Sequence, residues 1–155
     1  MIPYFAYGSN MSAGRIMQRL GWSPRHEGAL LQDYLLVFDQ PGFNESHWSP
    51  ANIRSEEEGL VEGMVYHLEE RDLGILDGYE KYYRRKDVEV ALKKGGTIRA
   101  VTYLSEDAAL ATLPTREYLD FLLEGREFLS SNYFSMLQSI RTVDETPTDD
   151  SGKGS

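Results

Sequence analysis

The sequence predicts an α+β fold, in which a small mixed, largely antiparallel sheet forms a barrel with helices packed outside it. Short apolar or alternating segments, typical of strands, recur as far as residue 104, with helical segments between them and two helices after them. The length of 155 residues fits one domain. Five or six strands in a domain of this size can curl into a barrel.

The first unit is a strand, a tight turn and a helix. Residues 2–6 are apolar and aromatic, which is typical of a buried strand, and Gly8-Ser9-Asn10 ends it. A helix is predicted over residues 12–20, with Ser12 as its N-cap and Gly21 as its stop signal. Its inward face is predicted to carry Ile16, Met17 and Leu20.

The middle of the chain is predicted to be mostly extended. Residues 29–39 are rich in leucine and aromatic residues and are predicted to be a strand, whereas residues 40–50 contain loop-forming Pro, Gly and Asn. Two further strands are predicted over residues 51–53 and 59–68. A short helix over residues 69–79 follows them.

The last elements are a hairpin and two helices. Apolar residues alternate over 88–92 and again over 98–104, and Lys94-Gly95-Gly96 between them is typical of a hairpin turn. Helical spacing then predicts helices over residues 114–124 and 132–140. The inward faces are predicted to carry Tyr118, Phe121 and Leu122 in the first helix and Tyr133, Met136, Leu137 and Ile140 in the second.

Composition narrows the class of protein. The net charge of −9 disfavours binding to nucleic acid or to anionic membranes. There are no cysteines, which excludes disulfides and thiolate chemistry. No signal peptide or membrane span is apparent, so we expect a cytoplasmic protein. Residues 1–140 are predicted to form the domain, and residues 141–155 an acidic, disordered tail.

The Tyr7-Gly8-Ser9-Asn10 turn is a candidate binding site. A strand that ends in Gly-Ser-Asn and opens a helix points several backbone N–H groups at one spot, which suits an anion. Gly8 would let a ligand approach the backbone closely. The alternative is a helix cap without a ligand, and composition alone favours that alternative.

Several segments together resemble the γ-glutamylcyclotransferase family. The string from Tyr4 to Met11 resembles the opening signature of the family, and Leu76-Asp77-Gly78-Tyr79-Glu80 resembles the segment that carries its catalytic glutamate. The resemblance covers about residues 1–140 in a matching order. Its other segments are 30–38, Trp48 with 51–53, 59–66, and 114–127 with Tyr133.

This resemblance implies an enzyme that needs no cofactor or metal. The α-amino group of a small γ-glutamyl substrate would attack its own γ-carbonyl, releasing 5-oxoproline and a free amino acid or amine. Glu80 would be the catalytic residue that carries the proton. The substrate-binding residues implied by the resemblance are Tyr4, Phe5, Ala6, Tyr7, Gly8, Ser9, Asn10 and Tyr133. Family members are monomers or homodimers.

Alternatives stay open at several of these positions. Glu80 is shielded only if Tyr79, Tyr82 and Tyr83 cover it, and Arg84 and Arg85 would lower its pKa if they pointed inward. Tyr133 suits the core as well as a substrate site, and Trp48 suits packing on the domain or the pocket mouth. Lys81 and a shortened segment after Glu80 depart from the family pattern and leave the leaving group undefined. A cyclotransferase for γ-glutamyl amines (isopeptides) and a non-catalytic binding module are the competing functions.

Overall fold

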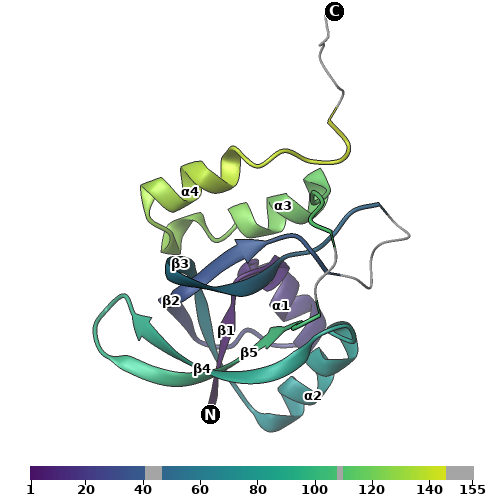
Figure 1. Ribbon diagram of the computed structural model, residues 1–155. Helices are drawn as coiled ribbons and strands as arrows, with labels where there is room; N and C mark the ends of the chain where they lie inside the picture. Colours follow the sequence, from purple (N-terminus) through teal and green to yellow (C-terminus); the bar gives the residue numbers. More distant parts are fainter. Residues whose placement is uncertain (41–46, 108–109, 146–155) are drawn as a thin grey trace, which may run out of the picture.

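The strands of the computed structural model, which describes residues 1–40, 47–107 and 110–145, form one closed barrel (Figure 1). Their order around the barrel is β1-β3-β2-β4-β5, and every neighbouring pair is antiparallel except β1 and β5, which are parallel. The predicted mixed, largely antiparallel barrel is confirmed. The strands are β1 (Ile2–Ala6), β2 (His26–Val37), β3 (Asn52–Leu68), β4 (Arg84–Leu92) and β5 (Thr97–Leu104).

Helices cover the outside of this barrel. In Figure 1, α3 and α4 lie along one side of the barrel and α2 lies on another. The helices are α1 (Ala13–Leu20), α2 (Glu70–Tyr79), α3 (Arg116–Leu123) and α4 (Ser131–Gln138), together with the single 3-10 turns η1 (Ser9–Met11) and η3 (Arg126–Phe128).

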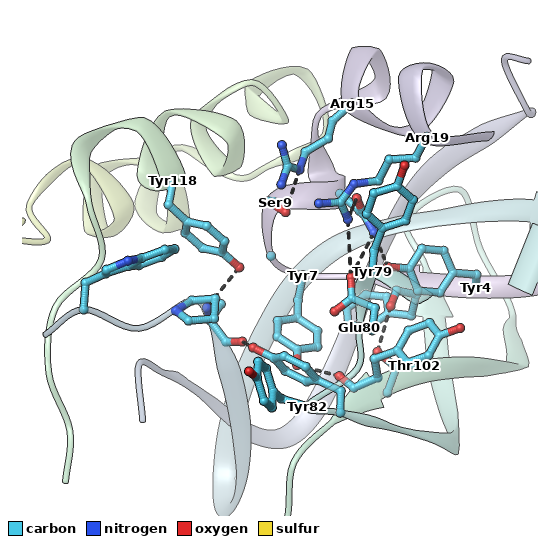
Figure 2. Close-up of a pocket in the computed structure, with 18 residues that line it drawn as sticks. Tyr4, Tyr7, Ser9, Arg15, Arg19, Tyr79, Glu80, Tyr82, Thr102 and Tyr118 are labelled. Carbon is cyan, nitrogen blue, oxygen red and sulfur yellow. Dashed lines mark hydrogen bonds and ion pairs between the residues drawn. The ribbon is translucent and has the colours of Figure 1, made fainter. Parts of the chain in front are cut away.

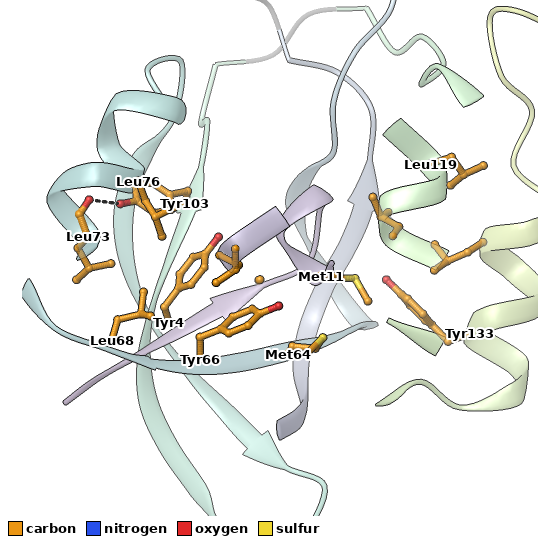
Figure 3. Packing of buried hydrophobic residues seen from close by; sticks show 14 residues of the cluster. Tyr4, Met11, Met64, Tyr66, Leu68, Leu73, Leu76, Tyr103, Leu119 and Tyr133 are labelled. Atoms are coloured by element: carbon orange, nitrogen blue, oxygen red, sulfur yellow. Dashed lines mark hydrogen bonds between the residues drawn. The ribbon is translucent and has the colours of Figure 1, made fainter. Parts of the chain in front are cut away.

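Strand alternation divides the core into two clusters. Phe5 on β1 packs with barrel residues such as Val61 and Val90, whereas its neighbour Tyr4 packs in a cluster that includes residues of the helices. Successive side chains of a strand point to opposite faces, so the first cluster fills the barrel and the second joins the barrel to its helices. Figure 3 shows this outer cluster, with Leu73 of α2 on one side of the barrel and Leu119 of α3 on the other.

The prediction of two separate strands over residues 51–53 and 59–68 was wrong, because β3 is one strand of 17 residues. Its pairing with β2 continues through Ser55, and a β-bulge there faces Asp33, whose Oδ1 accepts a hydrogen bond from the Glu58 backbone N at 3.0 Å. Residues 55–58 are exposed, so this part of the strand lacks the apolar alternation by which buried strands are predicted.

The helix that follows β1 begins and ends as predicted. The Ser12 hydroxyl accepts a hydrogen bond from the Arg15 backbone N at 3.1 Å, and Gly21 takes the left-handed conformation with φ of 83°. Ile16 is fully buried as predicted. Met17 is 52% exposed, so its predicted position on the inward face of the helix was wrong. On α4, Met136 is likewise partly exposed, whereas Leu137 is buried.

The packed chain extends to Glu145. Thr142 is buried, and the backbone N of Val143 donates a hydrogen bond to Pro114 O at 2.9 Å. The rest of the predicted tail, residues 146–155, lies outside the described residues. Within the described ranges, the helices are too short or too polar to cross a membrane.

Candidate active site

One cavity of about 260 Å³ is lined by the turn after β1, one face of α1, the end of α2 and the start of α3 (Figure 2). Tyrosine is the commonest residue in its walls. Its charged lining residues are Arg15, Arg19 and Glu80. The other lining residues are Tyr4, Phe5, Tyr7, Gly8, Ser9, Asn10, Trp48, Pro50, Ala51, Tyr79, Tyr82, Tyr83, Thr102, Tyr103 and Tyr118.

Glu80 is placed in this cavity by the end of α2. Leu73 and Leu76 anchor the helix on the barrel, since both are buried in the outer cluster. The Glu80 backbone N donates to Leu76 O at 2.9 Å, and its carbonyl accepts from the Tyr83 backbone N at 2.9 Å. These two bonds close a turn that points the Glu80 carboxylate into the pocket, where the side chain is 18% exposed.

Asn10 holds the groups around that carboxylate. Its Nδ2 donates to the Tyr4 hydroxyl at 2.9 Å and lies 3.5 Å from Glu80 Oε2, while its Oδ1 accepts from Arg19 Nη1 at 3.1 Å. Its backbone O accepts from the Tyr66 hydroxyl at 2.7 Å. The turn after β1 is therefore joined directly to the carboxylate at the end of α2.

Two opposing effects set the pKa of Glu80. Burial raises it above its ordinary value, because an ionised carboxylate is poorly solvated there. The positive charges of Arg19 and Arg15 act against this, and Arg19 Nη1 lies 3.5 Å from Oε2. Within the described part of the chain, Oε1 has neither a hydrogen bond nor an ion pair, so it is available to a ligand. A group with these properties can accept and return a proton.

The arginines that follow Glu80 in the sequence point elsewhere. Arg85 forms ion pairs with Asp77 at 2.8 Å and Glu70 at 3.2 Å, and Arg84 pairs with Glu106 at 3.1 Å. The Arg85 guanidinium lowers the pKa of Asp77. The cations that act on Glu80 therefore come from α1 and not from the start of β4.

Tyr118 lies across the pocket from Glu80 (Figure 2). Its hydroxyl accepts a hydrogen bond from the Ala51 backbone N at 3.0 Å. Burial raises the pKa of Tyr118 to about 12, although hydrogen bonds from the backbone of Ala51 and Ser9 act in the opposite direction. Among the described residues no acceptor takes the Tyr118 hydroxyl proton, so this group can donate to an oxygen in the pocket.

Gly8 is required by this arrangement. A Cβ at Gly8 would lie 2.7 Å from the Tyr118 hydroxyl oxygen, which is closer than real side chains approach. Because glycine has no side chain, the turn can pack closely against Tyr118 of α3, and a ligand could also approach the backbone there.

Other aromatic side chains form fixed walls. The Tyr7 hydroxyl donates to Tyr103 O at 2.6 Å, and the Tyr83 hydroxyl donates to Ala51 O. Trp48 lines the pocket and also packs on α3, with its ring 5.7 Å from the Tyr118 ring, so the structure shows features of both of its predicted positions. The Tyr7 and Tyr83 hydroxyls therefore donate to backbone carbonyls, and their rings form the walls of the cavity.

The structure brings most of the predicted site residues together but separates two of them. Glu80 and the turn residues line one pocket. Ala6 points into the outer cluster instead. Tyr133 is buried in that same cluster near Met11 and Met64 and does not line this pocket (Figure 3). Tyr118, which the sequence did not assign to the site, does line this pocket.

Sequence reasoning did not select Arg15, Arg19, Thr102, Tyr103 or Tyr118 for the site. A signal existed for the two arginines, because they stand four residues apart on the helix that leaves the turn and therefore share one face. Tyr118 was assigned to the core face of its helix, and periodicity does not distinguish a core from a pocket wall. In the described ranges, no three His, Cys, Asp or Glu side chains are grouped so that they could hold a metal ion.

Comparison with known protein families identifies the fold and its relatives. The family described as "Gamma-glutamyl cyclotransferase, AIG2-like" matches residues 4–122, which include both the turn and Glu80. This chain belongs to that family. The resemblance predicted from the sequence is confirmed.

Individual relatives are similar at moderate identity. A human protein described as uncharacterized has a solved structure with a TM-score of 0.84 and 29% identity, covering 94% of this chain and 90% of that one. A solved gamma-glutamyl cyclotransferase has a TM-score of 0.83 and 28% identity with the same coverage. A Methanocaldococcus jannaschii protein named "Putative gamma-glutamylcyclotransferase" is 29% identical over 75 residues, which span 46% of this chain and 62% of that relative's length.

More distant solved structures share only the fold with this chain. A yeast gamma-glutamyl cyclotransferase specific to glutathione has a TM-score of 0.62 at 13% identity, covering 88% of this chain and 93% of that one. Family membership and fold together support enzyme activity in general.

Proposed function

We propose that this protein converts a γ-glutamyl amino acid into 5-oxoproline and a free amino acid, with Glu80 as the proton carrier. The observation that carries the proposal is the position of Glu80. A mostly buried carboxylate with a raised pKa faces the cavity, 3.5 Å from the Asn10 side chain of the turn after β1, and one of its oxygens has no partner among the described residues. Such a group suits a reaction in which one proton is taken and another is delivered.

The reaction proceeds within one substrate molecule. Glu80 takes a proton from the α-ammonium group, and the free amine attacks the γ-carbonyl carbon to form the N–C bond of a five-membered ring. The tetrahedral intermediate collapses when the C–N bond to the leaving amine breaks, and Glu80 returns the proton to that nitrogen. The second proton of the attacking nitrogen, which is lost as the lactam N–H forms, also passes to the leaving amine, and that amine departs as an ammonium group. Atoms and charges balance without another reactant, and the protein contributes mainly by holding the bent conformer.

The carbonyl oxygen becomes negatively charged in the intermediate and needs a hydrogen-bond donor. The Tyr118 hydroxyl is the candidate, because it lies opposite Glu80 and keeps its proton while accepting from Ala51 N at 3.0 Å. Tyr7 and Tyr83 donate their hydroxyl protons to backbone carbonyls, which holds their rings in place as walls of the same pocket.

The test is production of 5-oxoproline from γ-glutamyl-alanine, γ-glutamyl-ε-lysine and glutathione by the wild-type chain. Glu80→Gln keeps the shape of the side chain but cannot take a proton, so turnover should fall by roughly 10²–10⁴-fold. Glu89→Gln, at an exposed position on β4, is the matched control and should retain full turnover.

Three outcomes contradict the proposal in different ways. Near-normal turnover by Glu80→Gln would refute the role of the carboxylate. Product from γ-glutamyl-ε-lysine alone would assign the isopeptide reaction instead. No product from any of the three substrates would favour a binding module of this fold.

A further inference from the structure

Two arginines reach the pocket from α1, and their surroundings differ. Arg19 has its partners inside the protein: Nη1 donates to Asn10 Oδ1 at 3.1 Å, and the guanidinium stacks on the Tyr79 ring at 4.3 Å. It also faces Glu80 at 3.5 Å. Arg19 therefore belongs to the end of the pocket where Glu80 acts.

Arg15 has a guanidinium with unused donors. Its Nε donates to Ser9 Oγ at 3.0 Å, and its plane stacks on the Phe121 ring at 4.3 Å. In the described part of the chain it forms no ion pair, although the protein carries a net charge of −9. Figure 2 shows its guanidinium above the space between Tyr118 and Glu80. The Nε bond and the stacking fix the direction of the side chain, which lines the pocket, and neither Nη group has a hydrogen-bond or ion-pair partner among the described residues.

We infer that Arg15 binds the carboxylate of the leaving amino acid and so selects γ-glutamyl amino acids over γ-glutamyl compounds whose leaving amine has no carboxylate. This inference rests on the proposed function. A planar guanidinium already held by Ser9 and Phe121 is pre-organised for a carboxylate, which accepts two parallel hydrogen bonds from such a fork.

The geometry of the substrate separates its two carboxylates. The α-carboxylate of the γ-glutamyl group is attached to the carbon that bears the attacking amine, so it must lie near Glu80, at the Arg19 and Asn10 end of the pocket. The leaving nitrogen is bonded to the γ-carbonyl carbon, on the other side of the attacking amine, and its substituent extends away from that end. Residues four apart on a helix have Cβ atoms about 5–6 Å apart, so α1 can offer one guanidinium to each carboxylate.

The charge of the pocket agrees with this assignment. Its charged lining residues are one glutamate and two arginines, which gives an excess of one positive charge. A γ-glutamyl amino acid carries two carboxylates and one ammonium at neutral pH, so it complements that excess. A γ-glutamyl amine with an uncharged leaving group is zwitterionic and leaves Arg15 without a counter-ion.

The experiment compares γ-glutamyl-alanine with γ-glutamyl-alaninamide, which differ only in the charge of the leaving group. For wild type and for Arg15→Met, kcat/KM is measured on both substrates. The kcat/KM for the acid divided by that for the amide is then calculated for each protein, and the wild-type value is divided by the value for the variant. This double ratio cancels the different reactivities of the two leaving amines. Loss of the charge-assisted hydrogen bonds should make it roughly 10- to 100-fold.

Two further variants separate recognition from support of the fold. Arg15→Lys keeps the charge without the fork and should give a smaller double ratio than Arg15→Met. Arg99→Met, at an exposed position on β5, should give a double ratio near one. Thermal unfolding of each variant shows whether the packing on Phe121 survives.

The possible failures are distinguishable. If Arg15→Met lowers kcat/KM equally for both substrates, or changes neither, Arg15 does not read the leaving carboxylate and the inference is overturned while the proposed function stands. If wild type forms no 5-oxoproline from either substrate, the proposed function is overturned as well.

Discussion

A Cβ added at Gly8 tests the contact that joins the turn to α3. In Gly8→Ala that carbon would lie 2.7 Å from the Tyr118 hydroxyl oxygen, while the lower limit of ordinary contact is 3.4 Å. The oxygen must retreat by about 0.7 Å, and a retreat directed away from Ala51 N would lengthen its 3.0 Å bond to about 3.7 Å, beyond hydrogen-bonding distance. A stranded backbone N–H costs about 1–3 kcal/mol, partly offset by about 0.4–1 kcal/mol from a stiffer unfolded chain.

The central values of these two effects, about 2 and 0.7 kcal/mol, leave an expected loss of about 1.3 kcal/mol of unfolding free energy, or roughly 3–5 °C in Tm for a chain of this size. Tyr118→Phe removes the clashing oxygen, and the next Tyr118 atom, Cζ, lies 3.9 Å from the added carbon. In that background Gly8→Ala should cost almost nothing, which gives a coupling energy of about 1–2 kcal/mol in a double-mutant cycle.

Urea unfolding of the wild type, the two single variants and the double variant measures this coupling. Gly14→Ala is the control, because the nearest atom to its added Cβ is 3.8 Å away and alanine is favoured in a helix. Single-variant effects that simply add, within about 0.5 kcal/mol, would refute the proposed contact between Gly8 and Tyr118.

Three other predictions concern single groups. In the proposed reaction Glu80 must be ionised to take a proton, and burial raises its pKa while Arg19 lowers it. We therefore expect kcat/KM to rise with pH around a midpoint above the ordinary glutamate pKa, and Arg19→Met to move this midpoint upward. An unchanged midpoint in the variant would contradict the prediction. Burial opposes ionisation of Glu62, but hydrogen bonds from Ser130 and Lys93 hold its pKa below the ordinary glutamate value. Glu62→Gln should therefore lower the unfolding free energy, measured in urea, by about 1.5–3 kcal/mol at neutral pH. This difference from wild type should shrink as the pH falls from the ordinary glutamate pKa through the lowered pKa of the folded protein, and a difference that is independent of pH would contradict the prediction. Tyr133→Phe should leave kcat/KM unchanged, because Tyr133 lies outside the pocket, and a large fall would restore the role that the sequence assigned to it.

Local signals in the sequence predict those elements whose chemistry is local. The bounds of β1 agree with its apolar run, and the start of α1 depends on the Ser12 hydroxyl and its end on Gly21. The interruption predicted within β3 was wrong because the strand pairs with β2 on both sides of its exposed bulge, a long-range effect that side-chain patterns do not record.

The site was predictable where the chain supplies a motif and not where it depends on how helices cross the barrel. Glu80 and the turn were assigned to one site by family resemblance, and the structure places Asn10 Nδ2 3.5 Å from Glu80 Oε2. Tyr118 and Tyr133 both stand on apolar faces of late helices, and nothing local distinguishes them. Only the packing of α3 on η1 brings Tyr118 to the turn, while α4 carries Tyr133 into the outer cluster.

In the proposed reaction, the arginines of α1 would let one carboxylate serve both proton transfers. Burial without a cation would protonate Glu80 too readily and remove the base, whereas a cation without burial would make it too weak a base to take a proton from an ammonium group. In this pocket burial has the larger effect on the pKa, and Arg19 and Arg15 moderate it. A substrate carboxylate that neutralises Arg15 would weaken that restraint and raise the pKa of Glu80 further. Binding of a γ-glutamyl amino acid would therefore leave Glu80 more basic than binding of a substrate with an uncharged leaving group, while Arg19 still keeps the pKa from rising without limit.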